Sequence, residues 1–238
     1  MYIKWPTNGL NTVKEFNKLR GKNSFPDVFG CVDSTHIPIP TQLSDDLYRN
    51  KKGFHSVILQ CICNAKMEFI DIYCGWPGSI NDARVWENSP IYEKLRDFAY
   101  PLQKFIMVPF KENEHLSTKQ RQFNAILSNT AALIEQSFGI LKGIFRRLKY
   151  IYVTKLTNIK YIIISCCILH NIGLRNNDVE DFVIQDDDND DLDESENVPT
   201  SDCEEAVELR NCIMNKIFYI TSKLTRFSSR CIFKFAKH

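Results

Sequence analysis

The chain has 238 residues, of which 44% are hydrophobic and 25% are charged, a composition typical of a globular protein. This length gives room for one α/β domain of ordinary size or two small ones. The nine cysteines include no C-x-x-C pair, which excludes the common zinc-site spacings, and the longest apolar run, Tyr161 to Leu169, is too short to cross a membrane. We therefore expect a soluble protein with buried, reduced thiols.

The amino-terminal part of the chain predicts a short helix followed by a strand. Residues 1–24 form an entry segment in which 12–19 suit a helix. Apolar residues between 28 and 39, with prolines at both ends, predict the first strand. This strand carries Asp33, followed by small polar residues and His36. Such an Asp can be a ligand for a hard metal ion at a sheet edge, or an ordinary turn or capping residue.

A basic loop and a hairpin follow the first strand. The loop contains Arg49-Asn-Lys-Lys-Gly-Phe-His55, which suits either a phosphate contact or an ordinary solvated connection. Nearly all residues of 57–63 are apolar, which predicts a central strand covered on both faces. A turn at 64–67 and an apolar partner strand at 69–74 complete the predicted hairpin.

The rest of the domain predicts mainly helices. Ser79 has capping-box-like spacing to Asp82, and Ser128 is a candidate cap between two helical segments. The last helix is apolar nearly all round, so we expect it to be buried, with His170 as a buried and hydrogen-bonded histidine. The predicted helices cover 79–95, 117–127, 128–148 and 158–174, with an extended piece at 105–110.

Charge is distributed unevenly, although the net charge is only +1. Between Asp178 and Glu208 there are 15 acidic residues and no lysine or arginine, which predicts disorder. A basic body beside this run suits a polyanion partner, with the acidic run as an intramolecular competitor or as a solvated linker. The expected units are an entry segment (1–24), an α/β domain (25–175), an acidic disordered linker (176–203), and a helix with a basic tail (204–238).

Three carboxylates stand out by their context: Asp33 at the end of the first strand, Asp97 before the second sheet segment, and Glu135 on a long helix. Acids from strands and from one helix, far apart in the chain, are what a two-metal phosphoryl-transfer site requires. Mg²⁺ and Mn²⁺ take oxygen ligands and relieve the repulsion between carboxylates held close together. Cysteine-based catalysis is disfavoured, because no cysteine has a base and an orienting acid at a recognisable spacing.

Five motifs occur in a specific order along the chain. They are Gly30-Cys-Val-Asp-Ser-Thr-His-Ile37, Arg49-Asn-Lys-Lys-Gly-Phe-His-Ser56, Gly75-Trp-Pro-Gly-Ser-Ile-Asn-Asp-Ala-Arg-Val85, Ile134-Glu-Gln-Ser-Phe-Gly-Ile-Leu-Lys142 and Leu169-His-Asn171. With this ordered set the chain resembles the PIF/Harbinger transposases and the Harbinger transposase-derived nucleases. The resemblance runs from about Tyr2 to Arg175, with a weaker part near 208–213.

This resemblance implies a ribonuclease H-like fold, a mixed α/β sheet flanked by helices, and DDE-type cleavage or strand transfer of DNA with Mg²⁺ or Mn²⁺. Asp33 matches the first acid of the family, Asp97 aligns with the middle one, and Glu135 matches the last. Asp82 matches a further acid that is either a metal ligand or a helix-start residue. The resemblance also implies that DNA is the substrate and that a separate DNA-binding protein is a partner. It implies no association with a membrane, and a location in the nucleus and also in the cytoplasm.

The chain departs from the family around the middle acid. Leu95-Arg-Asp-Phe-Ala-Tyr-Pro-Leu102 stands where the family has a strand, and the apolar residues that should precede Asp97 are missing. We therefore expect the strand of the middle acid to be truncated. Ile140 and Ile144 replace basic residues of the family, and its amino-terminal DNA-binding part is nearly absent. The alternative to an endonuclease is thus a catalytically impaired scaffold that binds DNA or protein.

Overall fold

The computed structural model describes residues 2–7, 9–20, 25–97, 106–111, 115–153, 155–178, 207–208, 210–214 and 231–234. The predicted acidic linker at 176–203 lies outside these residues apart from its first three positions, as does most of the basic tail. The side chain of Asp97 is also outside them, although its backbone is described.

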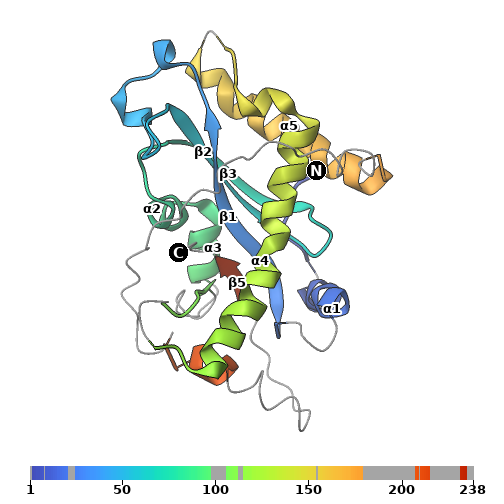
Figure 1. Ribbon diagram of the computed structural model, residues 1–238. Coiled ribbons are helices and arrows are strands. Elements are labelled where there is room, and N and C mark those ends of the chain that lie inside the picture. Colours follow the sequence, from blue (N-terminus) through green and yellow to red (C-terminus); the bar gives the residue numbers. More distant parts are fainter. Residues whose placement is uncertain are drawn as a thin grey trace.

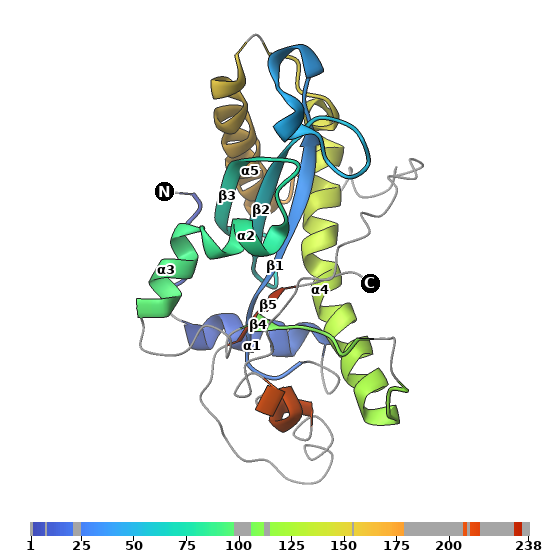
Figure 2. The same ribbon diagram turned by 90° about the vertical axis from the view of Figure 1, so that its left-hand side faces the viewer.

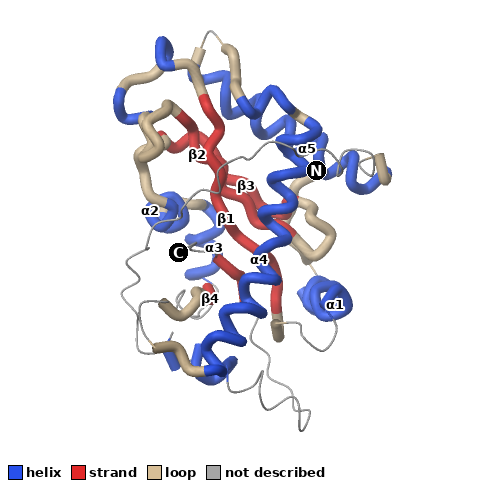
Figure 3. Tube along the Cα trace, viewed as in Figure 1, coloured by secondary structure: helices blue, strands red, loops and turns tan. Residues whose placement is uncertain are grey.

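A mixed sheet forms the centre of the described fold (Figures 1 and 3). Its strands are β1 (Val28–Pro38), β2 (Ser56–Cys63), β3 (Phe69–Pro77), β4 (Ile106–Met107) and β5 (Cys231–Lys234). The strand order is β3-β2-β1-β5-β4, with β1 antiparallel to β2, β2 antiparallel to β3, and β5 parallel to both β1 and β4. The predicted strands at 28–39, 57–63 and 69–74 are confirmed, and β1 has a neighbour on each side.

Helices cover both faces of this sheet (Figure 2). They are α1 (Gly9–Arg20), α2 (Asp82–Glu87), α3 (Pro90–Asp97), α4 (Thr118–Ile144) and α5 (Ile159–Asn176), with short 3-10 helices η2 (Thr41–Leu43), η3 (Asp46–Tyr48), η5 (Arg146–Lys149) and η6 (Leu156–Asn158). Residues 207–208 and 210–214 are also helical, and Ile213 packs into the core.

The side chains of β1 divide between the two faces of the sheet; they alternate from Cys31 onward, while an irregularity between Val28 and Gly30 shifts the residues before it. Cys31 and Ile37 belong to the larger core, which contains residues of α1, α4 and α5. Phe29 and Val32 belong to a second cluster with Trp86 of α2. Ile91 of α3 completes this second cluster. The first face is therefore covered by α4 and α5, and the second face by α2 and α3.

The predicted single helix over 79–95 is wrong, because the structure divides this segment into α2 and α3. The cap of α2 is Asn81, whose side chain accepts a hydrogen bond from the backbone N–H of Arg84 at 2.9 Å, and not Ser79. The Ser89 hydroxyl is buried and donates to the carbonyl of Trp86. Pro90 then begins α3, where its missing N–H is tolerated.

The predicted break at Ser128 is also wrong, because α4 runs without interruption from Thr118 to Ile144. Its start is as predicted: Ser117 and Gln120 form a complete capping box. Ser128 lies on the exposed side, and the buried stripe of the helix continues past it. Burial of this stripe outweighs the weak local preference of serine for a helix end.

One face of α5 is buried and the other is exposed. Ile163 and Cys167 are fully buried, whereas Tyr161 and Leu169 are 61% and 51% exposed, so the expectation of a helix buried all round is wrong. By length and apolar composition alone, the segment Leu156–Asn176 is sufficient to cross a membrane.

The region of the expected middle strand differs from the rest of the sheet. Asp97 is the last residue of α3, and β4 has only two residues. The position between β1 and β4 is occupied by β5, whose partners on β1 extend from Val28 to Val32. A strand from the carboxy-terminal end of the chain thus stands beside β1.

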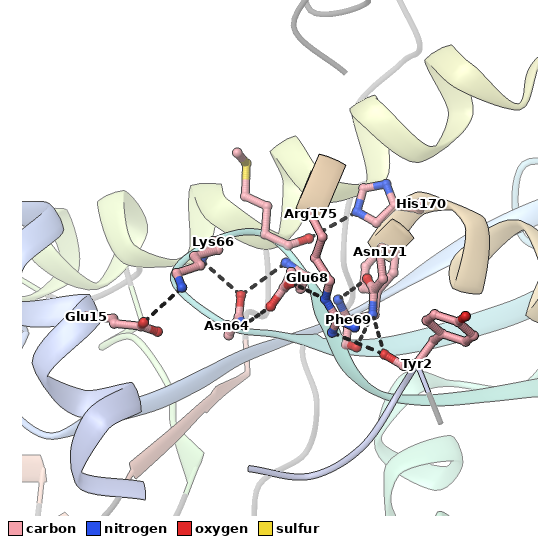
Figure 4. A network of polar contacts seen from close by, with 10 residues as sticks. Tyr2, Glu15, Asn64, Lys66, Glu68, Phe69, His170, Asn171 and Arg175 are labelled. Carbon is pink, nitrogen blue, oxygen red and sulfur yellow. Dashed lines mark hydrogen bonds and ion pairs between the residues drawn. The ribbon is translucent and has the colours of Figure 1, made fainter. Parts of the chain in front are cut away.

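Three polar residues at the end of α5 clamp the turn between β2 and β3 (Figure 4). The Asn171 amide accepts a hydrogen bond from the backbone N–H of Phe69 at 2.8 Å and donates to its carbonyl at 2.7 Å. His170 lies 3.0 Å from the carbonyl of Met67 through Nε2, and Arg175 donates to Glu68 at 2.6 Å. The Leu169-His-Asn171 motif therefore joins the helix to the sheet, and the predicted buried, hydrogen-bonded His170 is confirmed.

We expect Asn171→Ala to lower the free energy of unfolding by about 2–4 kcal/mol, because both backbone polar groups of the buried Phe69 lose their partner. Urea denaturation of the purified protein measures this change. Asn176→Ala is the matched control, since Asn176 is exposed at the end of the same helix. Equal stability of the two variants would contradict a clamping role.

Asp71 gives the fold a pH-dependent element. It is the register partner of Ile62, so it lies on the second face of the sheet. Burial raises the pKa of the Asp71 carboxyl to about 6, against a smaller opposing effect of Lys94. The folded protein therefore binds a proton that the unfolded chain releases at lower pH.

Because the folded pKa is raised, the stabilisation from protonated Asp71 is complete below about pH 4 and is lost as the pH rises through 6. We expect Asp71→Asn to remove this loss, so that the stability difference between variant and wild type grows by about 2–3 kcal/mol from pH 4 to pH 7.5. Urea denaturation at several pH values measures it. Asp46→Asn, at an exposed position, should show no such trend.

Candidate metal and nucleic-acid site

Asp33 lies on the face of the sheet that α4 covers. In β1 it stands between Cys31 and Thr35, and both Cys31 and Ile37 contribute to the larger core on that face. Asp33 is half-buried, and its register partner on β2 is the buried Cys61. The carboxylate is therefore held on the middle strand of the sheet, with backbone pairing on both sides up to Val32.

Two contacts fix the direction and level of α4 along β1. The Cys31 thiol donates to the carbonyl of Thr130 at 3.2 Å. Later in both segments, the N–H of Ile151, which follows α4, donates to the carbonyl of Pro38 at 3.1 Å. The helix and the strand thus run in the same direction.

This alignment sets the relative height of the two acids. Asp33 is two residues beyond Cys31, a rise of about 7 Å in a strand. Glu135 is five residues beyond Thr130, a rise of about 7.5 Å in a helix. Asp33 and Glu135 therefore stand at about the same level along the paired elements.

Glu135 lies at the border of the buried stripe of α4. It directly follows Ile134, which is fully buried, and is itself partly exposed. A carboxylate at such a border can face both the sheet and solvent. This is the position that a metal ligand requires if a polymer substrate is to reach the ion from outside.

The other two predicted acids belong to helices that cover the opposite face of the sheet. Asp82 is the first residue of α2, and Asp97 is the last residue of α3. Both helices contribute to the second cluster, through Trp86 and Ile91. Within the part of the chain that the structure describes, no three His, Cys, Asp or Glu side chains form a metal-binding group.

Several motif residues have structural roles at the end of β1. The Ser56 hydroxyl lies 2.9 Å from Nδ1 of His36 and accepts a hydrogen bond from the Asn50 amide at 3.2 Å. Gly78 packs so closely there that an added Cβ would overlap Ser56 and lie 2.9 Å from the carbonyl of Tyr48. These contacts hold the basic loop against the sheet, and they explain why the second glycine of the Gly-Trp-Pro-Gly motif, Gly78, has no side chain.

Cys61, Cys74 and His170 are not suited to catalysis. Burial and the neighbouring Cys167 raise the pKa of Cys61 well above its usual value, and burial raises that of Cys74 to about 12. These thiols stay protonated at neutral pH, so they are not nucleophiles. Burial also lowers the pKa of His170, which keeps its ring neutral.

One group of exposed residues was not predicted from the sequence. Tyr150 and Tyr152 are 51% and 73% exposed, while Ile151 between them is fully buried. The alternation of tyrosine and isoleucine in Tyr150-Ile-Tyr152, directly after four residues with three basic side chains, is the signal that indicates such a surface.

The amino-acid sequence matches known proteins over most of the described domain. The family model for DDE superfamily endonucleases matches residues 32–171. The human protein named "Putative nuclease HARBI1" is 28% identical over 188 residues, which cover 73% of this chain and 53% of that protein. "Protein ALP1-like" from Arabidopsis thaliana is 25% identical over 213 residues, which cover 78% of this chain and 51% of that protein.

The Xenopus laevis protein that is also named HARBI1 is 30% identical over 180 residues, which cover 68% of this chain and 49% of that protein. The chain thus spans about half the length of these relatives. No solved structure matches it.

The family match includes both carboxylates on the α4 side and ends at Asn171, the residue that clamps α5. It covers more than half of the chain, and the resemblance to Harbinger transposase-derived nucleases is confirmed. This chain belongs to the DDE superfamily endonuclease family.

Proposed function

We propose that this chain is an endonuclease domain that cleaves phosphodiester bonds of DNA with a divalent metal ion held by Asp33 and Glu135. The observation that carries the proposal is the common level of these two acids along the paired α4 and β1. Membership of the DDE endonuclease family supports the same chemistry.

The residues fit a hard metal ion. Asp33 and Glu135 offer only carboxylate oxygens, which Mg²⁺ and Mn²⁺ prefer over nitrogen or sulfur ligands. A bound ion would polarise the phosphate and lower the pKa of an attacking water. The chain's own part is to hold two like charges at one level, with Asp33 on a strand paired to its neighbours and Glu135 on a helix that is buried along one side.

Asp97 and Asp82 are the candidates for a third carboxylate that the family resemblance offers, although their helices cover the face of the sheet opposite to α4. Asp97 has the stronger case by sequence, because it aligns with the family's middle acid. The positions of α2 and α3 on the opposite face disfavour both acids to a similar degree. We also propose DNA as the substrate, a nuclear and cytoplasmic location, and a separate protein that supplies DNA-binding contacts. The relatives are about twice as long as the segment they share with this chain.

We expect Glu135→Gln and Asp33→Asn each to reduce Mn²⁺-dependent nicking of supercoiled plasmid DNA by at least about 100-fold. The reason is that metal ions supply several kcal/mol of transition-state stabilisation, and each 1.4 kcal/mol is a factor of ten in rate. Glu87→Gln is the matched control, since Glu87 is exposed on α2. Removal of the metal by a chelator should abolish nicking by the wild type.

Wild-type rates in both carboxylate variants would contradict the proposed site. DNA binding by all proteins without nicking by any of them would favour the scaffold alternative. An unchanged urea midpoint in Glu135→Gln and Asp33→Asn shows that a loss of activity does not come from unfolding.

Metal binding can be followed without activity, through the thermal stability of the protein. We expect Mn²⁺ to raise the melting temperature of the wild type, because a ligand that binds the folded state stabilises it. Asp33→Asn and Glu135→Gln should lose this shift. If Asp97 is the third ligand, Asp97→Asn should reduce the Mn²⁺-induced shift in melting temperature and Asp82→Asn should leave it unchanged. The reverse result would assign the role of third ligand to Asp82.

A further inference from the structure

Exposed tyrosines and cations are concentrated where α4 ends and α5 begins. We call this surface the basic-aromatic ridge. It consists of Arg146, Arg147, Tyr150, Tyr152, Lys155, Lys160 and Tyr161, all of which are exposed. The ridge includes η5 and the extended segment that follows it.

Two buried residues hold the ridge tyrosines on the outside. Leu148 and Ile151 are fully buried, and the backbone N–H of Ile151 donates to the carbonyl of Pro38 on β1. In an extended segment this leaves the residues on either side of Ile151, Tyr150 and Tyr152, pointing to solvent. Their ring centroids are 6.3 Å apart, so they form one aromatic platform and not two isolated side chains.

The ridge is strongly basic. Four of its seven residues are lysines or arginines, and the sequence has no acidic residue between Glu135 and Asp178. The Arg147 guanidinium donates to the carbonyl of Tyr152 at 2.8 Å, which places a cation beside the platform. Lys160 lies 5.0 Å from the ring centroid of Tyr161, within the range of a cation–π interaction.

We propose that the basic-aromatic ridge binds a single strand of DNA. Cations attract the phosphate backbone, and exposed aromatic rings stack on unpaired bases. A duplex keeps its bases stacked on one another, so it would use the cations but not the tyrosines. An apolar protein partner would not require the four positive charges of the ridge.

The position of the ridge relates it to the proposed active site. Pro38, which Ile151 contacts, is five residues beyond Asp33 on β1, a distance of about 16 Å along the strand. A DNA strand that is unpaired next to a cleavage position could therefore contact the ridge. The choice of DNA rests on the proposed function, whereas binding of a single strand does not depend on cleavage.

The experiment measures binding of a fluorescent oligothymidylate to the whole chain by anisotropy, in a chelator so that no cleavage occurs. We expect the Tyr150→Ala/Tyr152→Ala double variant to bind this strand at least about 10-fold more weakly than wild type. Tyr150→Phe/Tyr152→Phe should bind nearly as well as wild type, because the ring faces remain. Tyr2→Ala, which removes an exposed tyrosine elsewhere, should have no effect.

The cations are tested separately by the salt dependence of binding. Arg146→Ala/Lys155→Ala should weaken binding and reduce the slope of log affinity against log salt concentration. Wild-type affinity of the Tyr→Ala variant for the single strand would overturn the proposal, and so would an equal loss for duplex DNA or tighter binding of an RNA strand of matched length. Plasmid nicking tests the proposed function, and strand binding in a chelator tests the ridge. Because either assay can fail while the other succeeds, the two proposals are distinguishable.

Discussion

The alignment of α4 with β1 is the constraint on which the candidate site depends. It is fixed by the hydrogen bond from the Cys31 thiol to the carbonyl of Thr130 and by the hydrogen bond from the N–H of Ile151 to the carbonyl of Pro38. A shift of the helix by one turn would move Glu135 by about 5.4 Å relative to Asp33. The buried stripe of α4 makes such a shift costly, because every side chain in it would leave its place in a close-packed core.

Local signals predicted the elements whose position depends on local chemistry. The helix start at Ser117, the hairpin turn at 64–67 and the apolar run of β2 all appear as expected. Ser128 misled the prediction because burial of a long stripe outweighs one residue's preference for a helix end. The place of β5 beside β1 is a contact between residues about 200 positions apart, for which no local pattern exists.

Part of the candidate site was predictable for the same reason. Asp33 and Glu135 stand on a regular strand and a regular helix, so their placement follows from periodicity and from the pairing of two elements. Asp97 lies in a segment where the helical pattern of α3 conflicts with the strand expected from the family, and the structure follows the helix. The motifs around Gly78 and Asn171 were specific markers of the family, yet their contacts concern packing and backbone hydrogen bonds.

The strand beside β1 bears on how many acids the proposed metal site could contain. The four residues of β5 are Cys231-Ile-Phe-Lys234, so this neighbour of β1 supplies backbone pairing and no carboxylate. Mg²⁺ is commonly held by one or two carboxylates together with substrate phosphates and water. Asp33 and Glu135 could therefore retain one ion once DNA is bound, even where a third acid contributes little. In that case the affinity for metal depends on DNA, and a surface that holds the DNA strand near β1 contributes to the assembly of the site itself.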